Sequence, residues 1–232
     1  GETMKTLSYV NFIISILFMA CYAYQAVYLV AALLKKQKVF KAKKLHRYGV
    51  LIAARNEEAV IAQLIRSVRA QKYPEELIDI FVVADNCTDN TAQAAREAGA
   101  VVYERHNTYA VGKGYALRFL LENIFKNFGE YAYDGFFVFD ADNVLDCHFV
   151  EAMNRTFTDG YEVVTSYRNS KNYGDNWISA GYALWFLRES RFLNRPRTQL
   201  GVNCAVSGTG FLVSAQAVRE DAGWPYHLLT ED

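Results

Sequence analysis

The sequence predicts an α/β fold with a mostly parallel β-sheet, preceded by one N-terminal transmembrane helix. Three observations predict it. Short apolar runs of strand length alternate with stretches whose apolar residues recur at helical spacing. The strand-like runs are almost continuously apolar, which is typical of strands that helices cover on both faces. An uncharged stretch, residues 7–34, comes before this alternation.

The uncharged stretch is long enough to cross a bilayer. As an α-helix, residues 7–34 would be about 42 Å long, whereas a hydrocarbon core is about 30 Å thick. Residues 35–47 then carry seven Lys or Arg and no acid. By the positive-inside rule this flank stays in the cytoplasm, so we expect a cell-membrane protein whose main domain faces the cytoplasm. A signal peptide fits poorly because the basic residues follow the apolar run, and a buried core helix is the remaining alternative.

The chain is expected to divide into four segments. The three residues before Met4 resemble the remnant of a cleaved expression tag. The predicted segments are the N-terminus with this remnant (1–6), the transmembrane helix (7–34), a basic juxtamembrane linker (35–47) and the α/β domain (48–232).

Charge and cysteine usage exclude some classes of partner. The formal net charge is zero, but 17 of the 25 Lys and Arg and 24 of the 25 Asp and Glu follow residue 47, so the domain is acidic by about seven charges. An acidic domain argues against nucleic acid as a partner. The basic flank beside the apolar stretch indicates anionic membrane lipid instead. The four cysteines show no metal-ligand spacing, and we interpret them as reduced thiols rather than disulfides or a zinc site.

Each element of the domain follows from a local pattern. Short apolar runs predict strands at 49–53, 80–84, 100–103, 136–139, 162–165 and 211–213. Helical spacing predicts helices over 60–68, 92–98, 117–128 and 149–157. Gly99 and Gly129 mark the ends of two of these helices.

An aromatic segment, Trp177–Leu193, stands apart from this alternation. It fits an amphipathic helix that lies against the membrane or against partner helices, and arginines in and after it favour lipid headgroups. Its apolar face could instead drive homo-oligomer formation, and a core helix is about equally compatible with the pattern.

Polar residues follow three of the predicted strands at the point where each ends. They are residues 54–57 (Ala-Arg-Asn-Glu), residues 85–89 (Asp-Asn-Cys-Thr-Asp) and residues 140–142 (Asp-Ala-Asp). Ligands of parallel sheets bind beyond the carboxyl ends of the strands. The order of the elements alone therefore predicts that these residues gather at one edge.

The chemistry of this edge points to a divalent cation and a phosphate. Asp140 and Asp142 would repel each other without a counter-charge, and oxygen ligands without Cys or His favour Mg²⁺ or Mn²⁺. A solvated turn is the alternative. Residues 112–114 (Gly-Lys-Gly) before a helix could offer N–H groups and an ammonium to a phosphate, or form a plain loop. No dinucleotide fingerprint and no P-loop motif is present.

The last residues offer a further acid. Residues 207–210 (Ser-Gly-Thr-Gly) precede the final predicted strand, and the sequence ends with Thr230-Glu231-Asp232. An Asp here could act as general base for a hydroxyl nucleophile, although taken alone it is merely an acidic end.

Read together, these motifs resemble the family 2 glycosyltransferases of the GT-A fold, a Rossmann-like nucleotide-sugar domain. The resemblance covers residues 48–232 and is closest to the membrane-bound branch of cellulose-, chitin- and hyaluronan-synthase-like enzymes and bacterial N-acetylglucosaminyltransferases. It implies an inverting, metal-dependent transfer from a UDP-sugar to a glycan acceptor in polysaccharide synthesis.

The resemblance also implies residue roles. It assigns donor binding to Ala53, Arg55, Glu57, Asp85, Lys113 and Asp140, the Mg²⁺ or Mn²⁺ to Asp142 and Asp140, the acceptor side to Ser207, Gly208, Thr209 and Glu231, and the catalytic base to Asp232. The branch continues past the Thr-Glu-Asp motif with a QxxRW motif and further membrane helices, so the domain is expected to be C-terminally incomplete here.

Other functions remain open at this point. One is transfer of a single sugar to a polyprenyl phosphate or another lipid-linked acceptor, which needs the same fold and the same acids. Another is a membrane-tethered, non-catalytic nucleotide-binding fragment. A sugar nucleotidyltransferase is less suitable because residues 54–57 are not a glycine- and arginine-rich phosphate loop.

Overall fold

The computed structural model describes residues 2–34, 40, 44–170, 173–221 and 223–225. Most lysines of the basic flank and the whole Thr230-Glu231-Asp232 motif lie outside the described residues. The chain forms two compact units. The first unit comprises residues 1–39 and 167–205, and the second comprises residues 40–166 and 206–232.

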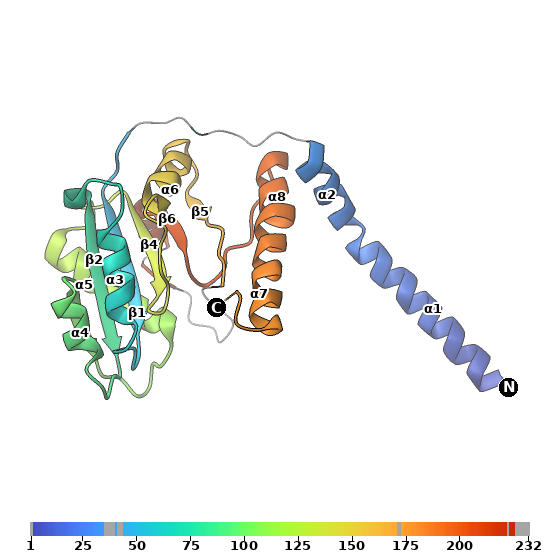
Figure 1. Ribbon diagram of the computed structural model, residues 1–232, viewed down its shortest axis with the longest axis horizontal. Helices are drawn as coiled ribbons and strands as arrows, with labels where there is room; N and C mark the ends of the chain where they lie inside the picture. Colours follow the sequence, from blue (N-terminus) through green and yellow to red (C-terminus); the bar gives the residue numbers. More distant parts are fainter. Residues whose placement is uncertain (1, 35–39, 41–43, 171–172, 222, 226–232) are drawn as a thin grey trace. The chain divides into compact units, whose positions relative to one another are not determined.

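The second unit is built on a six-stranded sheet with the strand order β3-β2-β1-β4-β6-β5 (Figure 1). The strands are β1 (Tyr48–Ala54), β2 (Ile78–Asp85), β3 (Val101–Arg105), β4 (Gly135–Asp140), β5 (Val163–Thr165) and β6 (Phe211–Ser214). The pairs β3-β2, β2-β1 and β1-β4 are parallel, whereas β6 runs antiparallel to both β4 and β5. The predicted mostly parallel α/β fold is therefore confirmed.

Helices cover both faces of this sheet. One face packs against α3 (Ile61–Arg69), α4 (Thr91–Glu97) and α6 (Phe149–Thr158). The other packs against α5 (Lys113–Phe128) and α9 (Ala215–Glu220). A short 3-10 helix, η1 (Glu75–Leu77), precedes β2. Successive residues of a strand point to opposite faces, and both faces are apolar because both are covered.

Two boundaries differ from the sequence expectation in an informative way. Helix α5 begins at Lys113, four residues before the apolar stripe that starts at Leu117, because its first turn, Lys-Gly-Tyr-Ala, has no large aliphatic residue to reveal helical spacing. Strand β3 lies at the edge of the sheet and is only partly buried, so its apolar run does not indicate burial on both faces.

The first unit contains the apolar helix and the aromatic segment. It consists of α1 (Glu2–Tyr22), α2 (Tyr24–Leu34), α7 (Trp177–Arg188), the π-helical turn η2 (Glu189–Asn194) and α8 (Arg195–Leu200). Met4–Leu34 is the one stretch among the described residues that is helical, long and apolar enough to cross a membrane, on length and composition. Within this unit α2 contacts the aromatic segment: Arg188 Nη2 donates to Gln25 Oε1 at 2.8 Å.

The helix predicted over Trp177–Leu193 is present, but it changes to π-helical geometry at Glu189. Helix α7 buries Ala183 and leaves Trp177, Tyr182 and Trp185 exposed. The exposed side chains are largely apolar, so α7 is not a buried core helix among the described residues, while contact with lipid or with a partner stays a prediction.

Candidate active site

Three loops leave the carboxyl edge of the sheet side by side. Strand β1 lies between β2 and β4, and its Ala53 pairs with Val83 on one side and with Asp140 on the other. The loops after these strands carry the polar residues predicted to gather here. The topology confirms this convergence, whereas the roles of the individual residues stay predictions.

Hydrogen bonds join the loops after β1 and β2. Asn56 Oδ1 accepts from the Thr88 N–H at 2.8 Å, and the Glu57 N–H donates to Thr91 Oγ1 at 2.7 Å. Both loops turn through the left-handed region, at Asn56 with φ 57° and at Asn86 with φ 52°, where asparagine is more readily accommodated than most residues. The two loops therefore form one fixed wall of the site.

Asp89 strengthens this wall. Its Oδ1 accepts from the Thr91 hydroxyl at 2.5 Å and from the Thr91 N–H at 3.0 Å, and its Oδ2 accepts from the Glu58 N–H at 3.2 Å. These bonds favour the ionised carboxylate, so they lower the pKa of Asp89 below its ordinary value, with the Thr91 hydroxyl as the largest cause. Asp89 thus stabilises the conformation of the loop after β2.

Asp85 forms a buried ion pair with a residue that the sequence motifs did not reveal. Arg105 Nη1 donates to Asp85 Oδ1 at 2.6 Å, and each side chain is about 8% exposed. The pair arises from register, because Asp85 and Arg105 are opposite each other at the ends of β2 and β3. The sequence held one indication of this pair: a basic residue, Arg105, ends the strand that follows the strand ended by Asp85.

Arg105 also fixes the loop that leads to Lys113. Its Nη2 donates to the Ala110 carbonyl at 2.6 Å, while Asn86 and Asn107 exchange two hydrogen bonds nearby. One guanidinium thus holds both Asp85 and the chain segment before α5.

Lys113 connects three elements at the end of β4. Its Nζ donates to Asp140 Oδ1 and to the Gly208 carbonyl, both at 2.5 Å, and its side chain is 15% exposed. Gly112 precedes it with φ 138°, a conformation that residues with a Cβ rarely adopt. Lys113 therefore offsets the Asp140 carboxylate and ties it to the loop before β6.

The Asp140–Asp142 loop is also joined to the predicted acceptor side. Thr209 Oγ1 accepts from the Asp140 N–H at 2.8 Å and donates to Asn143 Oδ1 at 2.6 Å. Asn143 Nδ2 in turn donates to Asp142 Oδ1 at 3.1 Å. Thr209 is buried, whereas Asp142 is exposed and presents its carboxylate at the surface of this edge.

The donor atoms at this edge suit a hard cation. Asp140 and Asp142 supply carboxylate oxygens within one short loop, and neither cysteine nor histidine is among the residues assigned to it. Mg²⁺ keeps few protein ligands and completes its shell with water and phosphate oxygens, so two carboxylates are a sufficient protein contribution.

The other predicted residues are placed as follows. Ala53 and Glu57 are half-buried and Arg55 is exposed, all at the β1 end of the edge. Ser207 and Gly208 are half-buried in the loop before β6. Glu231 and Asp232 lie outside the described residues.

A sheet of this topology, with paired carboxylates and a lysine at its carboxyl edge, is typical of the GT-A class of glycosyltransferase domains. Residues 46–232 match the family described as "Glycosyltransferase like family 2", and the chain belongs to this family.

Curated relatives are similar over part of their length. A β-monoglucosyldiacylglycerol synthase from Nostoc sp. is 29% identical over 198 residues, which cover 79% of this chain and 39% of the relative. A 4,4'-diaponeurosporenoate glycosyltransferase from Staphylococcus aureus is 34% identical over 105 residues, or 44% of this chain and 25% of the relative. The chain thus spans well under half the length of these relatives.

Solved structures share the fold. The mannosyltransferase PcManGT from Pyrobaculum calidifontis, in complex with GDP-Man and Mn²⁺, superposes with a TM-score of 0.64 at 17% identity, covering 93% of this chain and 59% of that one. S. aureus TarS 1-349 in complex with UDP gives a TM-score of 0.53 at 14% identity, covering 79% and 51%.

Proposed function

We propose that this chain transfers a sugar from a UDP-sugar to an acceptor hydroxyl, with inversion at the anomeric carbon and with Mg²⁺ or Mn²⁺ as cofactor. The arrangement at the end of β4 carries the proposal. There Asp140 ends the buried strand β4, Asp142 follows it, and the Lys113 ammonium lies 2.5 Å from Asp140. Carboxylates for a cation and an ammonium for phosphate oxygens together suit a diphosphate.

The wall formed by the loops after β1 and β2 suits the nucleoside. The Asp85 carboxylate, held by Arg105, can accept a hydrogen bond from the ring N–H of uracil. Arg55 and Glu57 lie on the adjacent loop, where they would contact the ribose and base edge. Because hydrogen bonds fix this wall in advance, little ordering is needed on binding.

The chemistry divides among residues of this chain. Asp140 and Asp142 would hold the metal, which stabilises negative charge on the departing diphosphate. Lys113 adds a second positive charge on the same side. Asp232, whose role rests on the resemblance, takes the acceptor proton while the acceptor oxygen bonds to the anomeric carbon. The bond from that carbon to the diphosphate breaks, and UDP leaves with its electron pair.

Calorimetry of UDP binding with and without Mn²⁺ tests the donor half. Wild type should bind UDP in a Mn²⁺-dependent manner, and Asp142→Asn should lose that dependence. Asp232→Asn should bind UDP normally but lose turnover by about 10²–10⁴-fold, the usual contribution of a general base. Metal-independent UDP binding in wild type, or full turnover by Asp232→Asn, would contradict the proposal.

The acceptor separates two versions of this function. A glycan acceptor in polysaccharide synthesis follows from the motif resemblance. A lipid acceptor is favoured by the apolar helix Met4–Leu34 and by the names of the relatives, which refer to monoglucosyldiacylglycerol and to 4,4'-diaponeurosporenoate. Radiolabelled UDP-sugars with membranes distinguish them, since one product extracts into organic solvent and the other stays with polymer. Nucleotide binding without any product would identify a non-catalytic module.

We further propose that Met4–Leu34 anchors the chain in the cell membrane with residues 48–232 in the cytoplasm. Length and composition of that helix and the basic flank support this orientation. The exposed aromatics of α7 would then contact lipid, with self-association as the competing explanation. Protease protection in sealed vesicles tests the orientation, and crosslinking of the full chain tests self-association.

A further inference from the structure

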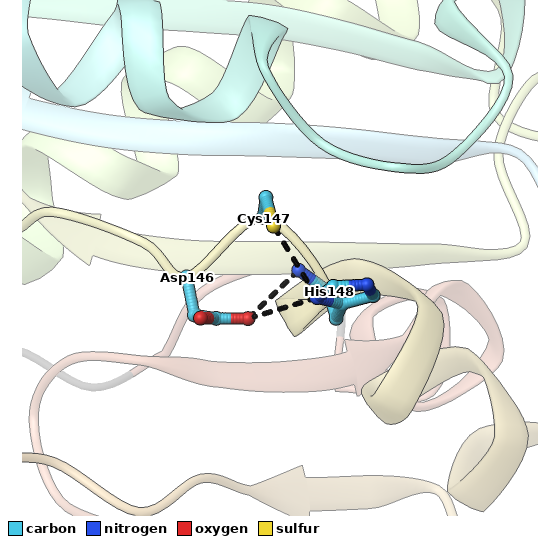
Figure 2. A group of neighbouring side chains, drawn as sticks. All are labelled: Asp146, Cys147 and His148. Carbon is cyan, nitrogen blue, oxygen red and sulfur yellow. Dashed lines mark hydrogen bonds and ion pairs between the residues drawn. The ribbon is translucent and has the colours of Figure 1, made fainter.

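Three side chains in the loop between β4 and α6 converge on one point. Cys147 Sγ and His148 Nδ1 are 3.3 Å apart, and Asp146 Oδ1 lies 3.5 Å from the same ring nitrogen. All three potential ligand atoms lie within 4.8 Å of one another. Figure 2 shows the thiol and the carboxylate both directed toward His148 Nδ1. The proposed donor site does not use any of these residues.

We propose that Asp146, Cys147 and His148 form a binding site for one zinc-type divalent cation, separate from the oxygen-ligand site at Asp140 and Asp142. A thiolate, an imidazole nitrogen and a carboxylate are each among the groups that bind Zn²⁺ in proteins. Thiolate and imidazole select zinc-type metals over Mg²⁺ and Mn²⁺. The two negative charges of this set balance a divalent cation.

The two ligand–ligand distances that involve His148 Nδ1 fit two edges of a tetrahedral shell, and the third, between Cys147 and Asp146, is within 4.8 Å. With Zn–S near 2.3 Å and Zn–N and Zn–O near 2.0–2.1 Å, the edges of a tetrahedron are about 3.6 Å for S–N and about 3.4 Å for N–O. The observed separations of 3.3 Å and 3.5 Å are close to these edges. Three protein ligands leave the fourth position for water.

The backbone of this segment is held from outside the cluster. Gln71 Nε2 donates to the Asp146 carbonyl at 2.7 Å, and the Lys72 N–H donates to the Cys147 carbonyl at 2.7 Å. Gln71 is buried and its Oε1 also accepts from the Val150 N–H at 2.9 Å. The segment that follows α3 therefore fixes the loop, so that the ligands need little reorganisation to bind a cation.

The affinity of such a site is tested with Co²⁺ as a spectroscopic substitute for Zn²⁺. The full chain, stripped of metal under reducing conditions, is titrated with Co²⁺ in the absence of air. We expect one equivalent to bind with a thiolate-to-cobalt charge-transfer band in the near ultraviolet and visible bands typical of tetrahedral cobalt. Added Zn²⁺ should abolish these bands, whereas excess Mg²⁺ should not.

Matched variants locate the site. Cys147→Ser should abolish the charge-transfer band, whereas Cys204→Ser, which removes another partly buried thiol, should retain it. Asp146→Asn and His148→Gln should each weaken Co²⁺ binding by at least about tenfold. Mutating residues that only hydrogen-bond to metal ligands already costs about 10–100-fold in affinity, so loss of a ligand should cost no less. The Asp146→Asn change keeps a side-chain oxygen that can accept from the His148 N–H. Asp142→Asn should retain the band.

Thermal melting gives a second, independent readout. Zn²⁺ should raise the melting temperature of wild type and of Cys204→Ser, because a ligand that binds only the folded state stabilises it, and should not raise that of Cys147→Ser. The proposal is overturned if wild type shows no sulfur-dependent cobalt spectrum, or if Cys147→Ser binds Co²⁺ with the same spectrum and affinity.

Discussion

The buried pair of Asp85 and Arg105 allows a quantitative prediction. Arg105→Met replaces the guanidinium with a shorter, unbranched apolar side chain and leaves the Asp85 carboxylate without its counter-charge. Both side chains are about 8% exposed, so solvent does little to screen the loss. Removing one partner of a buried ion pair costs about 3–5 kcal/mol. For a chain of this size that corresponds to a fall in melting temperature on the order of 10 °C.

The assay is thermal melting of the full chain in detergent, combined with a double-mutant cycle. The cycle comprises Arg105→Met, Asp85→Asn and the double variant. Since each single variant leaves a buried partner uncompensated, the double variant should be more stable than the sum of the two losses predicts, by about 0.5–3 kcal/mol. Arg96→Met is the matched control, because the Arg96–Glu104 pair is about half exposed and should contribute about 1 kcal/mol or less.

The same substitution, Arg105→Met, should also affect nucleotide binding. Arg105 holds both Asp85 and the Ala110 carbonyl, so Arg105→Met should weaken UDP binding even at temperatures where the variant is folded. Arg96→Met should bind UDP as wild type does. The reasoning is refuted if Arg105→Met and Arg96→Met destabilise equally, or if the losses in the cycle are simply additive.

Three further predictions concern packing, charge and pH. Gly49→Ala should destabilise the domain by about 1–3 kcal/mol in thermal melting, because a Cβ there would lie 2.8 Å from the buried Phe136 ring. Lys113→Met should weaken UDP binding by calorimetry, and adding Mn²⁺ should recover only part of the loss. Thr91→Val should be less stable than wild type above about pH 4, and the difference should narrow at lower pH. The sign follows from the lowered pKa of Asp89. Its bond to Thr91 stabilises the folded state at pH values above the ordinary pKa of aspartate, and this stabilisation is lost as the pH falls through the pKa of the folded state. A difference in stability between Thr91→Val and wild type that stays constant during acid unfolding would contradict the prediction.

The apolar pattern predicted the fold because each strand is short, apolar and, in the centre of the sheet, covered on both faces. Polar residues after three strands predicted that these loops meet at one edge of the sheet, where the candidate site is placed, since the carboxyl ends of parallel strands lie together. Neither inference needs side-chain detail. The start of α5 shows the limit of this pattern, because its first turn, Lys-Gly-Tyr-Ala, has no large aliphatic residue at helical spacing.

What the sequence could not supply depends on register and on contacts distant along the chain. Arg105 meets Asp85 only because β2 and β3 align them. The hydrogen bonds from Thr209 to Asn143 and from Lys113 to Gly208 link segments far apart in the sequence. Asp146, Cys147 and His148 are consecutive in the sequence. A search for zinc motifs with spaced ligands, such as Cys-x-x-Cys, does not detect three proposed ligands that are adjacent.

The network around Lys113 has a consequence for the order of events under the proposed function. Lys113 holds the Asp140 carboxylate and the Gly208 carbonyl at the same time, and Thr209 beside Gly208 binds the Asp140 N–H. A cation bound at Asp140 would share that carboxylate with the Lys113 ammonium, which bonds its Oδ1. The ammonium would then be weakened in its bond to Asp140 and could turn toward a phosphate oxygen, which would also alter its bond to the Gly208 carbonyl. Donor binding would thereby alter the loop that carries Gly208 and Thr209, which is the predicted acceptor side. Thr209→Val should therefore change the affinity for the acceptor more when UDP and Mn²⁺ are present than when they are absent.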